Sequence, residues 1–292
     1  MASGGVLETQ IARNLLQEAS RLGVDLEAAL RNGNDASLRP TEIAQPALLL
    51  VECVLHSAIP FGFDIVAVAG HSVGEYAACV AAGALSPPDA MSLVIERSRA
   101  MASMRHGTMS AFLGMSANDV GTVCDEVSRT TGEVIAVANL NGPGQVVVSG
   151  TGRAVAAAAS LARERGLRRA MSLNVSGAFH SPLMTAAAAT FDAALDATDL
   201  TDPRVPVVCN VDAQPAYDAV ALRERLRRQL TEPVRWEDCV RRMIDLGTTR
   251  LVEVGPGKVL TGLARRIVPG VETASVDTLD SARELVPAEP TA

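Results

Sequence analysis

The residues with the clearest chemical potential lie at positions 70–76, which read Gly-His-Ser-Val-Gly-Glu-Tyr. An apolar run at 63–69 precedes them and a small-residue segment at 76–82 follows them, so we expect a strand, a turn and a helix. The glycines permit a sharp turn that lifts the hydroxyl of Ser72 clear of the sheet, and N–H groups at the start of the helix can stabilise an oxyanion. The pattern indicates a nucleophile elbow centred on Ser72. A serine that only caps a buried helix is the alternative.

A nucleophilic serine needs a base within hydrogen-bond reach, and that base is most often a histidine. Of the four histidines, His180 lies in the loop 175–184 between an expected strand and an expected helix, where a catalytic side chain can be presented. His71 adjoins Ser72, but neighbouring side chains on an elbow diverge, so we interpret His71 as a packing or hydrogen-bonding residue. On position alone His180 is the candidate base, and a histidine that only caps the next helix is the alternative.

Arg97 is conspicuous because of the helix face that it occupies. In the segment that follows Pro87, apolar residues recur at helical spacing, and Arg97 falls on that apolar side. Burying a guanidinium is unfavourable unless it is paired, and its planar fork matches a carboxylate. Two interpretations follow: Arg97 binds the carboxylate of a ligand, or it forms an internal salt bridge.

The elements around these residues alternate between strand and helix, which predicts an α/β protein. Between residues 106 and 175 the expected order is strand 108–115, helix 117–130, strands 134–140 and 145–149, helix 151–165 and strand 169–175. This βαββαβ order is typical of a ferredoxin-like unit, and the Asn-Gly-Pro-Gly turn at 141–144 marks its hairpin. We therefore expect a small subdomain at 106–175, a discontinuous large subdomain at 1–105 and 176–280, and a flexible tail at 281–292.

The large subdomain supplies the remaining expected elements. Helices are expected at 7–32, 46–56, 76–82, 86–104, 181–195, 219–229 and 236–246, and strands at 65–69, 205–211 and 250–254. A proline pair preceded by Ser86 opens the fourth of these helices.

Composition excludes several classes of function. The chain has 292 residues and a net charge of −7, so it lacks the basic surplus expected of a nucleic-acid-binding protein. Its five cysteines are scattered without C-x-x-C spacing, which argues for reduced thiols and against a disulfide framework or a metal site. We find no signal peptide and no transmembrane segment, and we expect a cytoplasmic protein that does not bind a membrane.

Seven motifs together resemble those of malonyl-CoA:acyl carrier protein transacylases and the related acyltransferase domains of polyketide synthases. The resemblance extends from about residue 7 to about residue 268. In chain order the motifs are Gln45-Pro-Ala-Leu48, Gly70-His-Ser-Val-Gly-Glu-Tyr76, Glu96-Arg97, Asn139-Leu-Asn-Gly-Pro-Gly-Gln145, Gly177-Ala-Phe-His-Ser-Pro182, Gln229 with Pro233-Val-Arg-Trp236, and Glu253-Val-Gly-Pro-Gly-Lys258.

The resemblance implies a fold and a set of roles. The fold would be an α/β-hydrolase-like parallel-sheet core with an inserted ferredoxin-like subdomain, and the active site would lie between the two. Ser72 would carry the acyl group as an ester, His180 would act as the base, and Arg97 would hold the carboxylate of a malonyl-type unit. The remaining implied positions are Gln45 and Asn141 in the pocket wall, Gln229 as the residue that orients the histidine, and Val73 and Phe179 as residues typical of malonyl-specific members.

The implied partners are malonyl-CoA and a phosphopantetheinylated acyl carrier protein, in fatty-acid or polyketide synthesis. Coenzyme A thioester would be a substrate, and no bound cofactor or metal is expected. Two other functions remain as alternatives. One is an α/β-hydrolase-type esterase or thioesterase, which would need an acid between the serine and the histidine and would leave Arg97 unexplained. The other is a non-catalytic module that docks a carrier protein.

The second alternative arises from a departure at the start of the chain. The family normally opens with a strand that ends in Gly-Gln-Gly-Ser-Gln, whose first Gln supplies an oxyanion-hole N–H. This chain begins Met1-Ala-Ser-Gly-Gly-Val-Leu and lacks that motif. The N–H of Val73 would remain as one donor, and loss of the other typically slows catalysis by about 10²–10³-fold. A truncated chain, a misplaced start and a divergent member are the three explanations.

Overall fold

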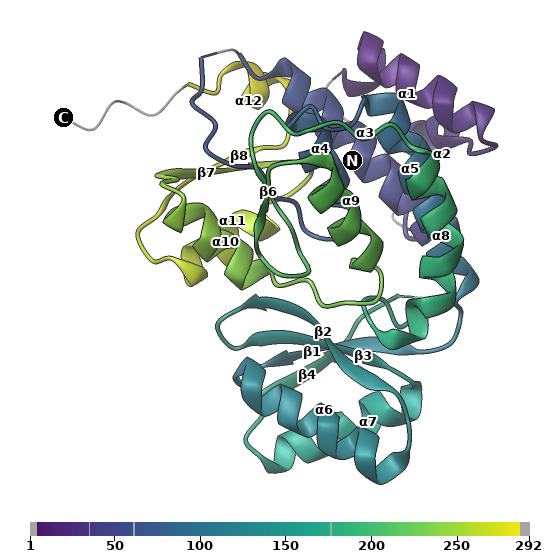
Figure 1. Cartoon of the computed structure of the whole chain (residues 1–292), viewed down its shortest axis with the longest axis vertical. Helices are drawn as coiled ribbons and strands as arrows, with labels where there is room; N and C mark the ends of the chain where they lie inside the picture. Colours follow the sequence, from purple (N-terminus) through teal and green to yellow (C-terminus); the bar gives the residue numbers. More distant parts are fainter. Residues whose placement is uncertain (1–4, 35, 61, 176, 287–292) are drawn as a thin grey trace.

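The computed structural model of the chain describes residues 5–34, 36–60, 62–175 and 177–286. The antiparallel sheet β1–β4 and its two helices form one end of the molecule, and the remaining elements form the larger part (Figure 1). The four residues that open the chain and the predicted tail beyond residue 286 lie outside the described residues.

The sheet at this end has the predicted ferredoxin-like order. Its elements are β1 (Thr108–Leu113), α6 (Ala117–Thr131), β2 (Ile135–Gly142), β3 (Gln145–Gly150), α7 (Gly152–Glu164) and β4 (Arg169–Ser172). The strands lie in the order β2-β3-β1-β4, and every pairing is antiparallel. We call this unit the small subdomain. Its boundaries at 105/106 and 175/176 stay a prediction.

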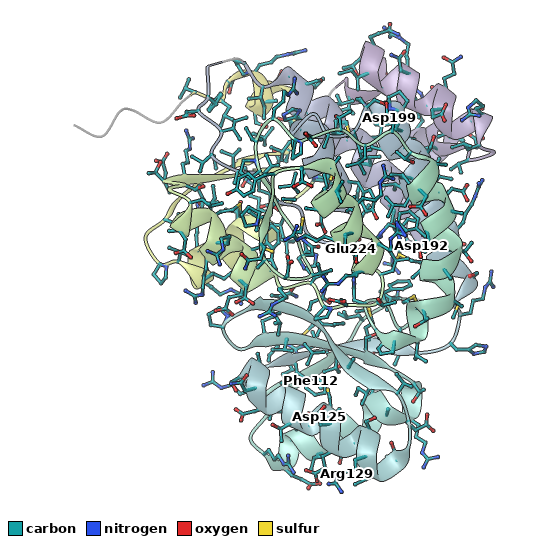
Figure 2. All side chains as sticks on the ribbon, viewed as in Figure 1. Phe112, Asp125, Arg129, Asp192, Asp199 and Glu224 are labelled. Atoms are coloured by element: carbon teal, nitrogen blue, oxygen red, sulfur yellow. The ribbon has the colours of Figure 1, made fainter. Side chains whose placement is uncertain are left out.

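The two faces of this sheet belong to different hydrophobic cores. Because side chains alternate along a strand, Phe112 points toward α6 and α7, whereas Met109 and Ala111 join the core of the larger part. Figure 2 labels Phe112 at the sheet, and Asp125 and Arg129 on α6; both of these charged residues are exposed. The sheet therefore lies between two apolar layers.

The larger part consists mainly of helices. They are η1 (Val6–Glu8), α1 (Gln10–Arg21), α2 (Leu26–Asn32), α3 (Thr41–Ala58), α4 (Gly74–Ala81), α5 (Pro87–Ser103), η2 (Pro182–Met184), α8 (Thr185–Ala197), α9 (Ala219–Arg228), α10 (Trp236–Asp245), α11 (Val259–Ile267) and α12 (Leu279–Arg283). In the described residues no helix is both long enough and apolar enough to cross a bilayer.

Short strands complete the larger part. They are β5 (Val207–Val208), β6 (Pro215–Ala216), β7 (Arg250–Val254) and β8 (Glu272–Val276). β7 and β8 pair in parallel, and a parallel bridge joins Val68 to Val207. This mixed α/β architecture with parallel strand pairing confirms the predicted fold class.

Several predicted elements differ in extent from those observed, most clearly the first helix and the two strands at 65–69 and 205–211. The helix expected at 7–32 is divided into η1, α1 and α2, because Gly23 adopts a left-handed conformation with φ 76° after α1. The strand expected at 65–69 is reduced to the bridge at Val68, and the strand expected at 205–211 to two residues. The chain turns at that point because the N–H of Cys209 donates to Gln214 in the β5–β6 hairpin. The predicted tail overlaps α12 at 281–283.

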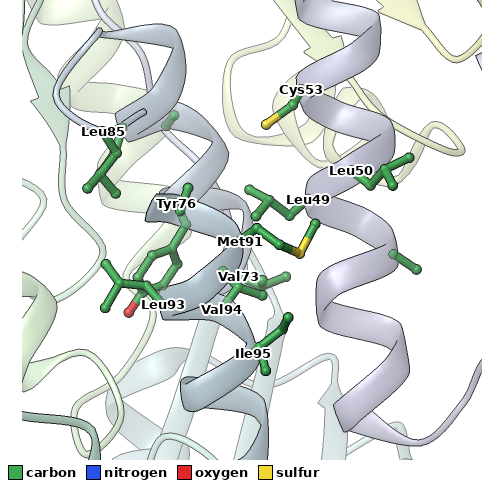
Figure 3. Close-up of a cluster of buried hydrophobic side chains, with 14 of the residues drawn as sticks. Leu49, Leu50, Cys53, Val73, Tyr76, Leu85, Met91, Leu93, Val94 and Ile95 are labelled. Atoms are coloured by element: carbon green, nitrogen blue, oxygen red, sulfur yellow. The ribbon is translucent and has the colours of Figure 1, made fainter. Parts of the chain in front are cut away.

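The helices α3, α4 and α5 pack into a rigid platform beneath the elbow. Figure 3 shows side chains from the three helices in contact, among them Leu49 of α3, Tyr76 of α4 and Leu93 of α5. The Ser86 hydroxyl caps α5 by accepting from the N–H of Asp89, and prolines occupy its first turn. This packing fixes the start of α4, two residues after Ser72, and the buried face of α5.

Candidate active site

The elbow at Ser72 is a tight turn that its glycines make possible. A Cβ on Gly70 would lie 2.0 Å from the carbonyl of Gly74, so no larger residue fits there. Ser72 itself has φ 53°, a left-handed conformation that a non-glycine residue rarely adopts. α4 begins two residues later, as expected for a nucleophile elbow.

Ser72 and His180 lie in direct contact. The Ser72 Oγ is 2.7 Å from His180 Nε2, and His180 Nδ1 is 2.9 Å from the backbone carbonyl of Gln229. Since a carbonyl only accepts, Nδ1 carries the proton and Nε2 is free to accept from the serine hydroxyl. His180 also has a left-handed backbone, with φ 55°. The arrangement is a nucleophile and a base oriented by a third group.

The environment keeps this histidine neutral. Burial in the protein and then the charge of Arg97 lower the pKa of His180 from 6.5 to about 3, although the hydrogen bond to Gln229 opposes the shift. At neutral pH the ring is therefore unprotonated and can accept a proton from Ser72. Of the two interpretations of His180, the structure favours the base over the capping residue.

Arg97 is a buried charge without a carboxylate partner. Its side chain is 1% exposed, and among the described residues no Asp or Glu lies within salt-bridge distance of it. Its Nη1 donates to Gln45 Oε1, its Nε and Nη2 donate to Gln229 Oε1 at 3.2 and 2.9 Å, and its Nη2 donates to Ser72 Oγ at 3.1 Å. The interpretation of Arg97 as half of an internal salt bridge is therefore wrong. Its charge instead lies next to the hydroxyl of Ser72.

Known proteins share this sequence pattern and this fold. The sequence pattern of the acyl transferase domain matches residues 6–281 of the chain. The chain belongs to the acyl transferase domain family. A malonyl CoA-acyl carrier protein transacylase of Bacillus subtilis is 42% identical over 270 residues, which are 91% of this chain and 85% of that relative. The resemblance inferred from the motifs is thus confirmed.

Solved structures of the same family superpose closely. An acyl-carrier-protein S-malonyltransferase from Burkholderia pseudomallei 1710b has a TM-score of 0.87 at 38% identity and covers 97% of this chain and 96% of its own. A malonyl-transacylase solved in complex with its type II PKS acyl-carrier protein has a TM-score of 0.88 at 34% identity and covers 96% of this chain and 94% of its own.

The other predicted site residues lie in three kinds of place. Gln45 and Gln229 hold the guanidinium of Arg97, as described above. Val73 and Phe179 are each 9% exposed and pack in the core of the larger part. Val73 follows Ser72 in the sequence, and Phe179 precedes His180. Asn141 makes no hydrogen bond to Ser72, His180 or Arg97 in the described residues; its Oδ1 lies 2.8 Å from Nε2 of His71, the residue before Ser72.

Two polar residues that hold the elbow were not predicted from the sequence as site residues. Asn210 and Glu75 are 0% and 1% exposed, and both make hydrogen bonds around Ser72. Glu75 lies inside the elbow motif itself, and Asn210 lies two residues after β5, near the carboxyl end of a strand where functional side chains gather. A buried polar residue at a strand end was the available signal.

The described residues contain no group of three or more His, Cys, Asp or Glu side chains that could hold a metal ion. The five cysteines are free and buried.

Proposed function

We propose that this protein transfers a malonyl group from coenzyme A to the phosphopantetheine thiol of an acyl carrier protein through an ester on Ser72. The observation that carries the proposal is the position of Arg97, a buried cation whose Nη2 lies 3.1 Å from the nucleophilic Oγ of a serine–histidine pair. A hydrolase needs no buried cation at this place. A transferase that selects a carboxylated acyl group does.

The first half-reaction forms the ester. His180 Nε2 accepts the proton of the Ser72 hydroxyl as Oγ attacks the thioester carbonyl, and the carbon–sulfur bond then breaks. The departing thiolate of coenzyme A then takes this proton from His180 and leaves as the thiol. Because Nδ1 of the ring donates to Gln229, the imidazole keeps its orientation while Nε2 gains and loses the proton.

The second half-reaction is the reverse with a different thiol. His180 Nε2 accepts the proton of the phosphopantetheine thiol, sulfur attacks the ester carbonyl, and the bond to Ser72 Oγ breaks. The proton on His180 then returns to Ser72. Throughout both steps Arg97 holds the free carboxylate by its planar fork, which fixes the acyl carbonyl above Ser72 and excludes acyl groups without a carboxylate.

The named relatives support the substrate and the partner. The Bacillus subtilis relative is a malonyl CoA-acyl carrier protein transacylase, and another relative was solved with its acyl-carrier protein. We assign the chain to fatty-acid or polyketide synthesis on that basis. We also propose a cytoplasmic location, which five free cysteines support.

Mass spectrometry of the intact protein after incubation with malonyl-CoA tests the proposal. We expect a malonyl adduct that is lost in Ser72→Ala and that moves to a holo acyl carrier protein on addition of the carrier. Release of malonate without an adduct would instead indicate a thioesterase. Carrier binding that survives Ser72→Ala, in a parent protein that forms no adduct, would indicate a docking module.

A further inference from the structure

Both peptide groups of Ser72 are held by side chains from distant parts of the chain. The N–H of Ser72 donates to Asn210 Oδ1 at 2.8 Å, and the carbonyl of Ser72 accepts from Gln229 Nε2 at 3.0 Å. These two residues follow Ser72 by 138 and 157 positions. Since Ser72 adopts a left-handed conformation that its own side chain disfavours, external bonds of this kind are what keep it there.

Asn210 spans the elbow from one side to the other. While its Oδ1 accepts from Ser72, its Nδ2 donates to the carbonyl of Gly70 at 2.7 Å. Its backbone carbonyl accepts from the N–H of Arg235 at 2.9 Å. The side-chain amide can satisfy Ser72 and Gly70 in only one orientation, because one needs an acceptor and the other a donor.

Glu75 joins the two holding residues to each other. Its Oε1 accepts from the backbone N–H of Asn210 at 3.2 Å, and its Oε2 accepts from Gln229 Nε2. With Nε2 directed at Glu75 and Ser72, the Oε1 of Gln229 must face the opposite way, toward Arg97. Glu75 therefore orients the side-chain amide of Gln229, which holds the guanidinium, and it also holds the backbone of Asn210, whose side chain holds the nucleophile.

We infer that Asn210 and Glu75 are positioning residues of the transfer reaction: Asn210 sets the reactivity of Ser72, and Glu75 sets both that reactivity and the placement of Arg97. The inference rests on the proposed function, since it assigns these residues to the site of malonyl transfer. Neither residue contacts the acyl group itself. They act through the backbone of the nucleophile and through Gln229.

The two residues are distinguishable because they touch different partners. Asn210 makes no hydrogen bond to Arg97 in the described structure, so its loss should slow acylation without changing the preference for a carboxylated acyl group. Glu75 reaches Arg97 through Gln229, so its loss should change both. A purely structural role would lower the folded fraction and would leave the preference of the remaining enzyme unchanged.

Three substitutions separate these effects with little change in volume. Asn210→Asp keeps the acceptor for Ser72 but places a second oxygen against the carbonyl of Gly70. Asn210→Leu removes both bonds. Glu75→Gln sets one amide nitrogen against another, unless Gln229 rotates and turns its own nitrogen toward Arg97.

Glu52→Gln is the matched control. Burial raises the pKa of Glu75 to about 7 and that of Glu52 in α3 to about 8. The Oε2 of Glu52 is buried without a hydrogen-bond partner in the described residues. It makes no hydrogen bond to the residues of the elbow or to Arg97. Its substitution makes the same chemical change, carboxylate to amide, at a half-buried position outside the hydrogen-bond network of Ser72.

The test measures single-turnover acylation of Ser72 in the full chain by rapid quench and mass spectrometry, with malonyl-CoA and with acetyl-CoA. We expect Asn210→Asp to acylate about tenfold more slowly and Asn210→Leu about a hundredfold, with an unchanged half-saturating malonyl-CoA concentration and an unchanged malonyl-to-acetyl ratio. Glu75→Gln should lower both the rate and the ratio. Glu52→Gln should stay within about twofold of the parent.

Labelling of Ser72 by phenylmethylsulfonyl fluoride gives a second readout that needs no thioester. A parent that labels but takes no malonyl group refutes the proposed function, and the labelling rates of the variants still test the positioning roles. Rates for Asn210→Asp and Glu75→Gln within twofold of the parent, or losses that only match the unfolded fraction by circular dichroism, would overturn the inference. If Asn210→Leu does not fold, the rates of Asn210→Asp and Glu75→Gln alone test the inference.

Discussion

Replacing Arg97 with Met separates the recognition of a carboxylate from the transfer of an acyl group. Methionine fills a similar volume and keeps the hydrophobic contacts with Tyr76, whose ring lies 5.6 Å from the guanidinium carbon. It removes the charge and the donors that face Gln45, Gln229 and Ser72. A malonyl group would then bring its carboxylate into a buried site without a partner.

The magnitude follows from this burial. A buried charge that loses its partner costs about 3–5 kcal/mol, and each 1.4 kcal/mol corresponds to about a tenfold change. For malonyl-CoA, kcat/KM should therefore fall by between about a hundredfold and several thousandfold. Acetyl-CoA has no carboxylate and does not incur this cost, so the ratio of the two substrates should change by the same factor.

The assay is transfer to a holo acyl carrier protein with each thioester, measured on the same preparation. The ratio of the two rates cancels any loss of folded protein, because both substrates meet the same folded fraction. Arg99→Met is the matched control on the same helix, since Arg99 is exposed and pairs with Glu96. An unchanged malonyl-to-acetyl ratio in Arg97→Met would refute the role of Arg97 as the carboxylate-binding residue.

Three further predictions concern stability and reactivity. The pKa of His180 is lowered to about 3, mainly by burial. The contribution of neutral His180 to the free energy of unfolding is therefore complete above pH 6.5 and is lost as the pH falls toward 3. Between pH 7 and pH 5 the free energy of unfolding of the parent should therefore drop by up to about 2 kcal/mol more than that of His180→Gln, measured by urea denaturation. Burial raises the pKa of all five thiols. An aromatic disulfide reagent at pH 8 should therefore react slowly with the native protein and should label every cysteine of the denatured protein. Rapid labelling of the native protein would contradict this. Gly121 in α6 and Gly262 in α11 have open space at the position of a Cβ. Alanine at each should therefore raise the free energy of unfolding by about 0.5–1 kcal/mol. A lowered thermal midpoint would contradict the helix geometry at that position.

Local sequence pattern was sufficient to find the candidate residues Ser72 and Arg97, which the structure brings together. The elbow was visible because a strand, two glycines and a helix are all encoded within about twenty residues around Ser72. Arg97 was visible because helical periodicity assigns each residue to a face, and a charge on the apolar face needs a reason. The small subdomain was predicted for the same reason, since its hairpin turn and the periodicity of its strands and helices are local signals.

The residues that hold the elbow could not be found in this way. Asn210 reaches Ser72 across 138 residues, and no local pattern shows which distant amide will meet a given peptide group. The extents of the strands around Val68 and Val207 depend on pairing between such distant segments as well. Periodicity finds the faces of elements, whereas tertiary contacts decide where strands end and which polar groups satisfy each other.

The sheet of the small subdomain has a consequence for engineering. One face of β1 contributes Met109 and Ala111 to the core of the larger part, and β2 is bonded to the segment at Val234 through Leu140 and Ala138 at 2.9 and 2.8 Å. An excised insert would expose an apolar surface to water and leave backbone groups without partners. Chimeras between members of this family should therefore exchange the small subdomain together with the segment around Val234, because the two form hydrogen bonds with each other.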